Sequence, residues 1–270
     1  MPEGHTLHRL AISHHRRFAG GVVRVSSPQG RFADGAALVD GRTLTRAEAW
    51  GKHLLHHYDS GLVVHVHLGL YGTFTESPAP LTEPVGQVRM RMIGGGRAAR
   101  PYGADLRGPT ACEVLHAPEV DALTARLGPD PLRPDADPER AASRIRRSSR
   151  SIAALLMDQS VVAGVGNVYR AEVLFRHGIS PRRQGRAVSA GQWDELWADL
   201  VALMNTGVRE GAIVVMRPED DHGAPSYASG KPRTYVYRRA GEPCRICATT
   251  IAHTVLQGRN LFWCPSCQPD

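Results

Sequence analysis

The sequence predicts an α+β fold in which a β-sandwich comes first, helices follow, and a small cysteine-rich module ends the chain. Short runs of β-branched residues, separated by Gly, Pro and Asp clusters, recur through residues 1–125 and are typical of a sandwich. Apolar residues at helical spacing dominate the next part, up to about residue 210. Two Cys-x2-Cys pairs near the C-terminus predict the final module.

The composition indicates a globular and basic protein. The chain has 270 residues, of which 42% are hydrophobic, and this is enough core material for two modest domains. Its net charge is +7, and Arg supplies nearly all of the positive charge. Because Arg binds phosphate in a bidentate way, this charge favours a polyanionic partner such as nucleic acid. Arg-rich composition also arises in GC-rich genomes, so charge alone leaves both interpretations open.

Nothing in the sequence indicates a membrane partner. No segment approaches the roughly 20 apolar residues that span a bilayer. The first residues lack the basic and then apolar regions of a signal peptide. We therefore expect a cytoplasmic protein with reduced thiols and, in the absence of any sign of oligomerisation, a monomer.

The β-rich part is expected to open with one helix. Leu7, Leu10 and Ala11 give this helix an apolar stripe, and Thr6 can cap it. Alternating or continuous apolar runs then predict short strands. These strands are at residues 22–25, 62–67 and 87–92.

A segment rich in Pro and Asp, residues 128–138, is a linker candidate before the helical part. Apolar spacing predicts helices at residues 152–159, 167–177 and 193–208. Residues 216–233 are polar and rich in Gly and Pro, so we expect a loop there.

The cysteine pairs have the spacing of a zinc site. Sixteen residues separate the two Cys-x2-Cys turns, and four thiolates at such spacing hold one tetrahedral zinc ion. Two disulfides are the alternative, which a reduced compartment disfavours. Because protein ligands fill all four positions, the predicted Zn²⁺ is structural and not catalytic. The predicted ligands are Cys244, Cys247, Cys264 and Cys267, while the lone Cys112 is expected to be a buried or half-buried thiol.

Two turns could bind phosphate. Between the cysteine pairs, Gly258 permits a tight hairpin turn from which Arg259 projects. Farther upstream, the glycine-containing turn 159–167 joins two helices, and Asn167 can cap the second. The free amides at that helix start attract anions. An ordinary solvated Arg and a plain capped turn are the alternatives.

The N-terminus could supply a nucleophile. Removal of Met1 before the small residue Pro2 would expose a secondary amine, and α-amino groups titrate near pH 8. Such an amine can attack C1′ of a damaged nucleoside, displace the base and leave an iminium, or Schiff base. Glu3 could move the protons as general acid and base. An ordinary disordered chain start is the alternative.

Together these features resemble the formamidopyrimidine-DNA glycosylase / endonuclease VIII (Fpg/Nei) family of bifunctional DNA glycosylases, over nearly the whole chain. Four segments carry the resemblance, and they look most like the endonuclease VIII branch found in actinobacteria. They are the start Met1–Gly4, the Gly51–Leu55 segment with its downstream His67–Gly72, the Leu156–Asn167 turn and the four-cysteine module.

The resemblance implies an N-terminal β-sandwich with flanking helices, then a helix–two-turn–helix domain with a zinc finger. The implied domains are a catalytic domain at residues 1–125, the DNA-binding helical domain at 126–233 and the zinc finger at 234–270. It also implies that loop 216–233 covers the damaged base.

The resemblance further implies a role for each matching position. Pro2 matches the Schiff-base nucleophile, Glu3 the general acid/base, and Lys52 a lysine that contacts phosphate and assists β-elimination. Arg259 matches the zinc-finger arginine linked to δ-elimination, and Leu70 with Tyr71 the wedge that fills the gap left by the flipped base. The remaining matches to DNA contacts are His67, Arg126, Asn167 and Tyr237. Gly69 departs from the pattern, because that branch has Gln there.

Three histidines could have roles of their own. His5 stands where relatives have Pro or an acidic residue; it could tune the amine, but we expect a surface residue. His65 and His67 alternate on one strand and would face the same side. No third ligand with suitable spacing accompanies them, so we expect no second metal.

The predicted function is excision of an oxidised base from damaged DNA, with pyrimidines implied as substrates, followed by strand cleavage through β,δ-elimination. A non-catalytic damaged-DNA-binding protein is the alternative, which fails to form a borohydride-trapped adduct on abasic DNA. A metal-dependent nuclease is a third interpretation, which predicts loss of cleavage in EDTA.

Overall fold

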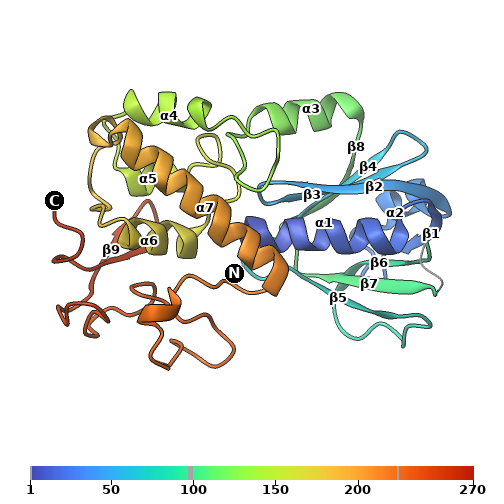
Figure 1. Cartoon of the computed structure of the whole chain (residues 1–270). Helices are drawn as coiled ribbons and strands as arrows, with labels where there is room; N and C mark the ends of the chain where they lie inside the picture. Colours follow the sequence, from blue (N-terminus) through green and yellow to red (C-terminus); the bar gives the residue numbers. More distant parts are fainter. Residues whose placement is uncertain (1, 97–99, 224) are drawn as a thin grey trace. The chain divides into compact units, whose positions relative to one another are not determined.

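The structure is a computed structural model that describes residues 2–96, 100–223 and 225–270 (Figure 1). The chain divides into two compact units, Met1–Arg126 and Leu127–Asp270. The first unit is dominated by a sheet and the second by helices, which confirms the predicted α+β fold. No helix among the described residues is long and apolar enough to cross a membrane.

The first unit is built on eight strands that pair into one antiparallel sheet in the order β5-β7-β6-β1-β2-β3-β4-β8. The predicted runs 22–25, 62–67 and 87–92 correspond to β1, β4 and β6. The strands are β1 (Gly21–Ser26), β2 (Arg42–Trp50), β3 (His53–Tyr58), β4 (Val63–His67), β5 (Thr73–Pro78), β6 (Val88–Gly94), β7 (Tyr102–Arg107) and β8 (Ala111–Leu115).

Helix α1 (Gly4–Phe18) fills the inside of this unit, and Figure 1 shows it between the strands β2–β3–β4 and the strands β5–β6–β7. Its buried face includes Leu7, Ala11 and Phe18, which recur at helical spacing as the sequence predicts. The predicted cap is wrong, because α1 begins at Gly4 with Glu3 at the N-cap position, and Thr6 lies inside the first turn. Two further helices of this unit are α2 (Ala33–Val39) and α3 (Ala117–Ala125).

The second unit packs four helices around an apolar core. The helices are α4 (Pro138–Arg146), α5 (Ile152–Met157), α6 (Asn167–Arg176) and α7 (Ala190–Glu210). The Ser189 and Gln192 side chains form a capping box at the start of α7, which fixes where the helix begins. Trp193, Leu196 and Leu200 then place one stripe of α7 in the core, as their spacing predicts.

The linker candidate 128–138 is in part a packed turn. The Gly128 amide donates to the Gln159 carbonyl over 2.9 Å, and the Ala163 amide donates to the Pro129 carbonyl over 3.0 Å. Asp130 is 2% exposed and accepts from the Leu132 amide. The first residues of this segment therefore belong to the second unit, and its Pro and Asp residues shape a turn there.

A two-stranded hairpin of β9 (Ala252–Leu256) and β10 (Arg259–Trp263) follows the helices. Its two turn residues, Gln257 and Gly258, both have positive φ, at 50° and 72°. A two-residue turn of this type matches the twist of the strands it joins. The loop predicted at residues 216–233 contains one short 3-10 helix, Pro218–Asp220.

Candidate active site and nucleic-acid interface

The N-terminal residues of the first unit are held at the start of α1. Pro2 is half-buried, and the Glu3 side chain is completely buried. A carboxyl group is rarely fully buried unless it is paired or functional. The chain start is therefore an ordered part of the unit from Pro2 onward, in contrast to the frayed start that many chains have.

The direction of α1 brings this start to the level of Lys52. The Gly20 amide, just after α1, donates to the Leu44 carbonyl, and the Ala47 amide donates to Nδ1 of His15. The N-terminal end of α1 is therefore directed toward the C-terminal end of β2. From His15 to Glu3 the helix rises about 18 Å. From Ala47 to Trp50, where β2 ends, the strand advances about 10 Å in the same direction, and Lys52 lies on the turn that follows. Pro2, Glu3 and Lys52 therefore lie at the same end of the first unit.

Two more predicted residues, His67 and Arg126, lie at this end. His67 is directly opposite His53 in the β3–β4 register, next to Lys52, and the two rings are 5.0 Å apart. Burial, the His65 and His67 rings, and the positive charges of Arg126 and Lys52 lower the pKa of His53 to about 3. Burial, followed by the His65 ring and the positive charge of Lys52, also lowers the pKa of His67. Lys52, His67 and Arg126 thus all act on the charge of His53, and positive charges there favour a nearby anion.

The predicted wedge lies on the tight turn after β4. Tyr71 is 86% exposed and Leu70 is 49% exposed, so both apolar side chains extend into solvent. Gly69 has a φ of +66°, and a Cβ on it would lie 2.5 Å from Cγ2 of Thr110. Thr110 in turn bonds to the ring and the carbonyl oxygen of His67. Gly69 is therefore required by the turn, which explains the departure from Gln at this position.

The expectation for His5 is wrong. His5 is 4% exposed and lies on the inner face of α1, where burial, with a smaller contribution from His8, lowers its pKa to about 4. Because α1 begins two residues earlier than its predicted cap, position 5 falls on the inner face of the helix. The ring is thus a neutral core group close to the chain start.

The four predicted zinc ligands form one cluster in the second unit. Their ligand atoms lie within 4.8 Å of one another, and none of the five cysteines is in a disulfide. Tetrahedral Zn²⁺ with Zn–S bonds of about 2.3 Å places sulfurs about 3.8 Å apart. The observed separations of 3.9, 3.5 and 3.4 Å fit one such ion, which these side chains would hold as a structural centre. Cys112 is half-buried, and burial raises its pKa to about 12.

Arg259 lines a hollow of about 200 Å³ in the second unit. Arg150 and Arg170 line the same hollow, together with Asp158, to which Arg150 is ion-paired over 2.9 Å. Three guanidinium groups against one carboxylate favour an anion such as phosphate. No motif in the sequence indicates Arg150 or Arg170, although Arg170 follows Asn167 by about one helical turn.

Asn167 has a different role from the predicted cap. Gly166 is at the N-cap position of α6, and Asn167 is its first residue. The Asn167 side chain is 5% exposed and donates from Nδ2 to the Asn260 carbonyl over 3.0 Å, while its Oδ1 accepts from Arg170. The residue therefore ties the start of α6 to the zinc hairpin.

Tyr237 lies in the core of the second unit. Its side chain is 3% exposed and packs edge-on against Phe262, and its amide donates to Glu172. The fully buried Glu172 carboxylate also accepts from the amides of Tyr235 and Val236. These three bonds fix the chain just after loop 216–233, whereas little of the Tyr237 side chain is available to DNA.

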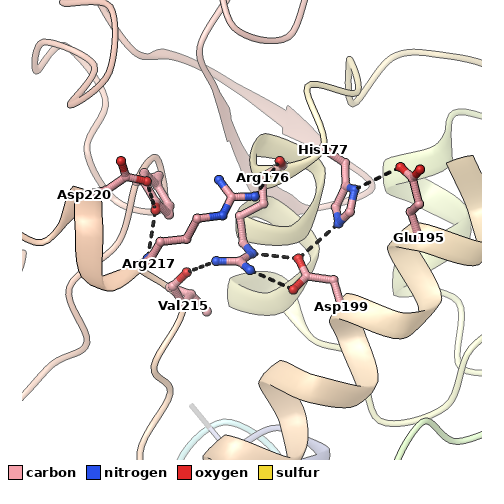
Figure 2. A network of polar contacts seen from close by, with 8 residues as sticks. Arg176, His177, Glu195, Asp199, Val215, Arg217 and Asp220 are labelled. Atoms are coloured by element: carbon pink, nitrogen blue, oxygen red, sulfur yellow. Dashed lines mark hydrogen bonds and ion pairs between the residues drawn. The ribbon is translucent and has the colours of Figure 1, made fainter.

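A second network fixes the chain just before this loop (Figure 2). Arg176 of α6 pairs with Asp199 of α7 over 2.6 and 2.8 Å and donates to the Val215 carbonyl over 2.8 Å. His177 lies 3.1 Å from the same carboxylate. Beside the loop lies a cavity of about 430 Å³, lined by residues that include Val215, Met216 and Arg233. The loop is thus anchored at both ends and borders a hollow large enough for a nucleobase.

Comparison with known proteins agrees with this arrangement. Residues 1–108 match the formamidopyrimidine-DNA glycosylase N-terminal domain, residues 127–218 its H2TH domain, and residues 241–269 a zinc finger found in FPG and IleRS. The chain is 63% identical to Endonuclease 8 1 of Mycobacterium tuberculosis over 99% of its own length and all of the relative. This chain belongs to the Fpg/Nei family of DNA glycosylases.

Other members of the Fpg/Nei family are more distant. A formamidopyrimidine-DNA glycosylase of Geobacillus kaustophilus is 35% identical over 86% of this chain and 84% of the relative. The MutM (Fpg) protein of Thermus thermophilus superposes with a TM-score of 0.77 at 26% identity, over 100% of this chain and 99% of that one. Lactococcus lactis Fpg bound to AP-site DNA superposes with a TM-score of 0.77 at 20% identity, over 99% of this chain and 100% of that one. This likeness shows the shared fold.

Proposed function

We propose that this Fpg/Nei enzyme excises oxidised bases, with pyrimidines preferred, and then cuts the strand. The observation that carries the proposal is the ordered chain start, in which Pro2 precedes a completely buried Glu3 at the same end of the unit as Lys52. An amine, a carboxyl group shielded from water and a lysine are the groups that base displacement and elimination require.

The proposed chemistry uses the free secondary amine of Pro2. Its nitrogen attacks C1′ of the damaged nucleoside, the bond to the base breaks, and the base leaves with a proton supplied through Glu3. The resulting iminium acidifies C2′, whose proton is removed as the 3′ phosphate leaves. Lys52 assists this β-elimination. Arg259 is proposed to assist the second elimination, the δ-elimination, which releases the 5′ phosphate.

DNA contacts are proposed for each unit separately. Lys52, His67 and Arg126 would bind backbone phosphate on the first unit, and Leu70 with Tyr71 would fill the gap left by the extruded nucleotide. On the second unit, Arg259 and its neighbours Arg150 and Arg170 would bind phosphate. Asn167 would act there through its bond to Asn260, and for Tyr237 only a contact through its backbone is proposed.

The domain division is proposed to follow the same assignment. Residues 1–125 would carry the chemistry, residues 126–233 the helical DNA-binding elements and residues 234–270 the zinc finger. The loop 216–233 and the adjoining cavity of about 430 Å³ would receive the extruded base. We further propose that the protein acts in the cytoplasm at the bacterial nucleoid. We also propose that it is a monomer, and sedimentation of the protein with and without DNA would test this oligomeric state.

Borohydride trapping on duplexes that each carry a single lesion tests the proposal. Oxidised pyrimidines should yield more excision and covalent adduct than 8-oxoguanine or formamidopyrimidine. Glu3→Gln should lower base excision far more than adduct formation on a pre-formed abasic site, because the base is already absent there. A protein that binds these duplexes but forms no adduct with any of them would instead be the non-catalytic binding protein.

A further inference from the structure

Three side chains on neighbouring strands form a hydrogen-bonded chain beside the proposed phosphate contacts. Nδ1 of His53 on β3 lies 2.8 Å from Nε2 of His65 on β4. Nδ1 of His65 lies 2.9 Å from Oε1 of Glu113 on β8. His65 is 4% exposed, whereas the Glu113 side chain is 55% exposed. The chain therefore runs from solvent, through a buried ring, to the half-buried His53 opposite His67.

We propose that Glu113, His65 and His53 form a proton relay that takes up one proton when a DNA phosphate binds beside His53 and His67. The inference rests on the proposed DNA contacts of Lys52 and His67 and adds to them a linked protonation. It concerns binding, and it is separate from the chemistry assigned to Pro2.

The number of protons that the relay holds leads to this inference. With Glu113 as the carboxylate, the proton on Nδ1 of His65 occupies the first hydrogen bond. Nε2 of His65 is then an acceptor, so the second bond requires a proton on Nδ1 of His53. Nε2 of His53 makes no hydrogen bond with the described residues. It then carries a lone pair and no proton, and this lone pair repels a phosphate oxygen. One additional proton on the relay turns this atom into a donor.

The charges around the relay explain why the additional proton arrives with the phosphate. Lys52 at the β2–β3 turn, His67 on β4 and Arg126 after α3 face His53 and disfavour a positive ring in the free protein. The other carboxylates on nearby elements have partners of their own or face solvent. Glu48 of β2 is paired with His57 and Arg46, Glu119 of α3 accepts from the His116 amide, and Asp121 is exposed. Glu113 is thus the carboxylate joined to the relay, and a phosphate would add the second negative charge.

Titration calorimetry of the zinc-loaded full chain tests the relay. The probe is a duplex with a tetrahydrofuran abasic analogue, titrated in buffers of different ionisation enthalpy between about pH 6 and pH 8. Wild-type protein should take up protons on binding, and this uptake should approach about one proton per duplex at the low end of the pH range. Its Kd should therefore increase by up to about tenfold for each unit by which the pH is raised. His53→Asn and His53→Gln should bind with this uptake largely lost.

Two further variants make the result specific. Glu113→Gln should shift the uptake to lower pH, because the amide no longer balances the added positive charge. His15→Gln, which removes an exposed histidine on α1, should leave the uptake unchanged. Binding by wild type without proton uptake, or equal uptake by wild type and both His53 variants, would overturn the relay while leaving DNA binding intact. Failure of wild type to bind the duplex would instead reject the proposed DNA contacts and the relay with them.

Discussion

Nδ2 of Asn167 donates to the backbone carbonyl of Asn260 over 3.0 Å and so joins the first turn of α6 to the zinc hairpin. Nη2 of Arg170 donates to the same carbonyl over 3.0 Å. Asn260 directly follows Arg259 in β10, so these two bonds set the position of the strand from which Arg259 projects. Asn167 thereby acts on the proposed phosphate site through the hairpin backbone.

Replacing Asn167 by Ala should loosen this connection. Arg170 would lose one partner and the Asn260 carbonyl one donor, so the second unit should lose about 1–2 kcal/mol of stability. DNA affinity should fall as well, because Arg259 is less well positioned. Urea unfolding and fluorescence anisotropy measure the two effects. Asn205→Ala is the matched control, because this exposed Asn donates to the Val201 carbonyl within α7. Equal effects of both variants would argue against the connection.

Replacing Arg259 by Ala should weaken DNA binding with little dependence on sequence. If its guanidinium neutralises one phosphate, the slope of log affinity against log salt should decrease by about one. The measurement is anisotropy at several salt concentrations. Arg186→Ala, an exposed Arg of the same unit that does not line the hollow, should keep the wild-type slope. An unchanged slope for Arg259→Ala would remove this residue from phosphate binding.

Replacing Gly69 by Ala should cost more stability than the same change at Gly61. Both glycines have positive φ, at +66° and +79°, but a Cβ on Gly61 has no atom within 4 Å, whereas one on Gly69 meets Thr110. The left-handed conformation alone costs about 1–2 kcal/mol with a side chain. Urea unfolding should therefore show a larger loss for Gly69→Ala, together with weaker DNA binding. Equal losses would mean that the turn adjusts to the methyl group.

Replacing Asp199 by Asn should destabilise the second unit near neutral pH. Burial opposes ionisation of Asp199, but bonds from His177 and Arg176 outweigh it and hold its pKa at about 2. A carboxylate whose pKa is lower in the folded than in the unfolded protein stabilises the fold at pH values above its unfolded-state pKa. This stabilisation is lost as the pH falls through its folded-state pKa. Because the group is partly exposed, we expect about 1–2 kcal/mol.

The difference in free energy of unfolding between wild type and Asp199→Asn should therefore become smaller as the pH falls from about 4 to about 2. Urea unfolding at a series of pH values measures it. Asp194→Asn, an exposed carboxylate on the same helix, should show a much smaller difference. A pH-independent loss for Asp199→Asn would assign the effect to packing in place of charge.

Local patterns predicted the elements that depend on neighbours in sequence. The spacing of the four cysteines and the Gly258 turn predicted the zinc hairpin, because its ligands and its turn are specified within a short segment. Helical spacing predicted α7 for the same reason, since one stripe of Trp and Leu is sufficient to define its buried face.

Features that depend on distant residues could not be predicted in this way. Thr6 is a better capping residue than Glu3 by type, yet α1 begins at Gly4 and encloses Thr6 in its first turn. The Pro- and Asp-rich segment resembles a linker until the partners of Gly128 and Pro129 are known. The His53–His65–Glu113 chain joins three strands, so only the sheet register reveals it.

The covalent intermediate is the most direct test of the proposed chemistry. The protein is incubated with lesion-containing duplex, reduced with borohydride and digested, and the DNA-linked peptide is sequenced by mass spectrometry. The expected adduct is on the nitrogen of Pro2 at a mature chain end that lacks Met1. An adduct on Lys52, or fully active protein that retains its initiator methionine, would contradict the assignment of Pro2 as the nucleophile.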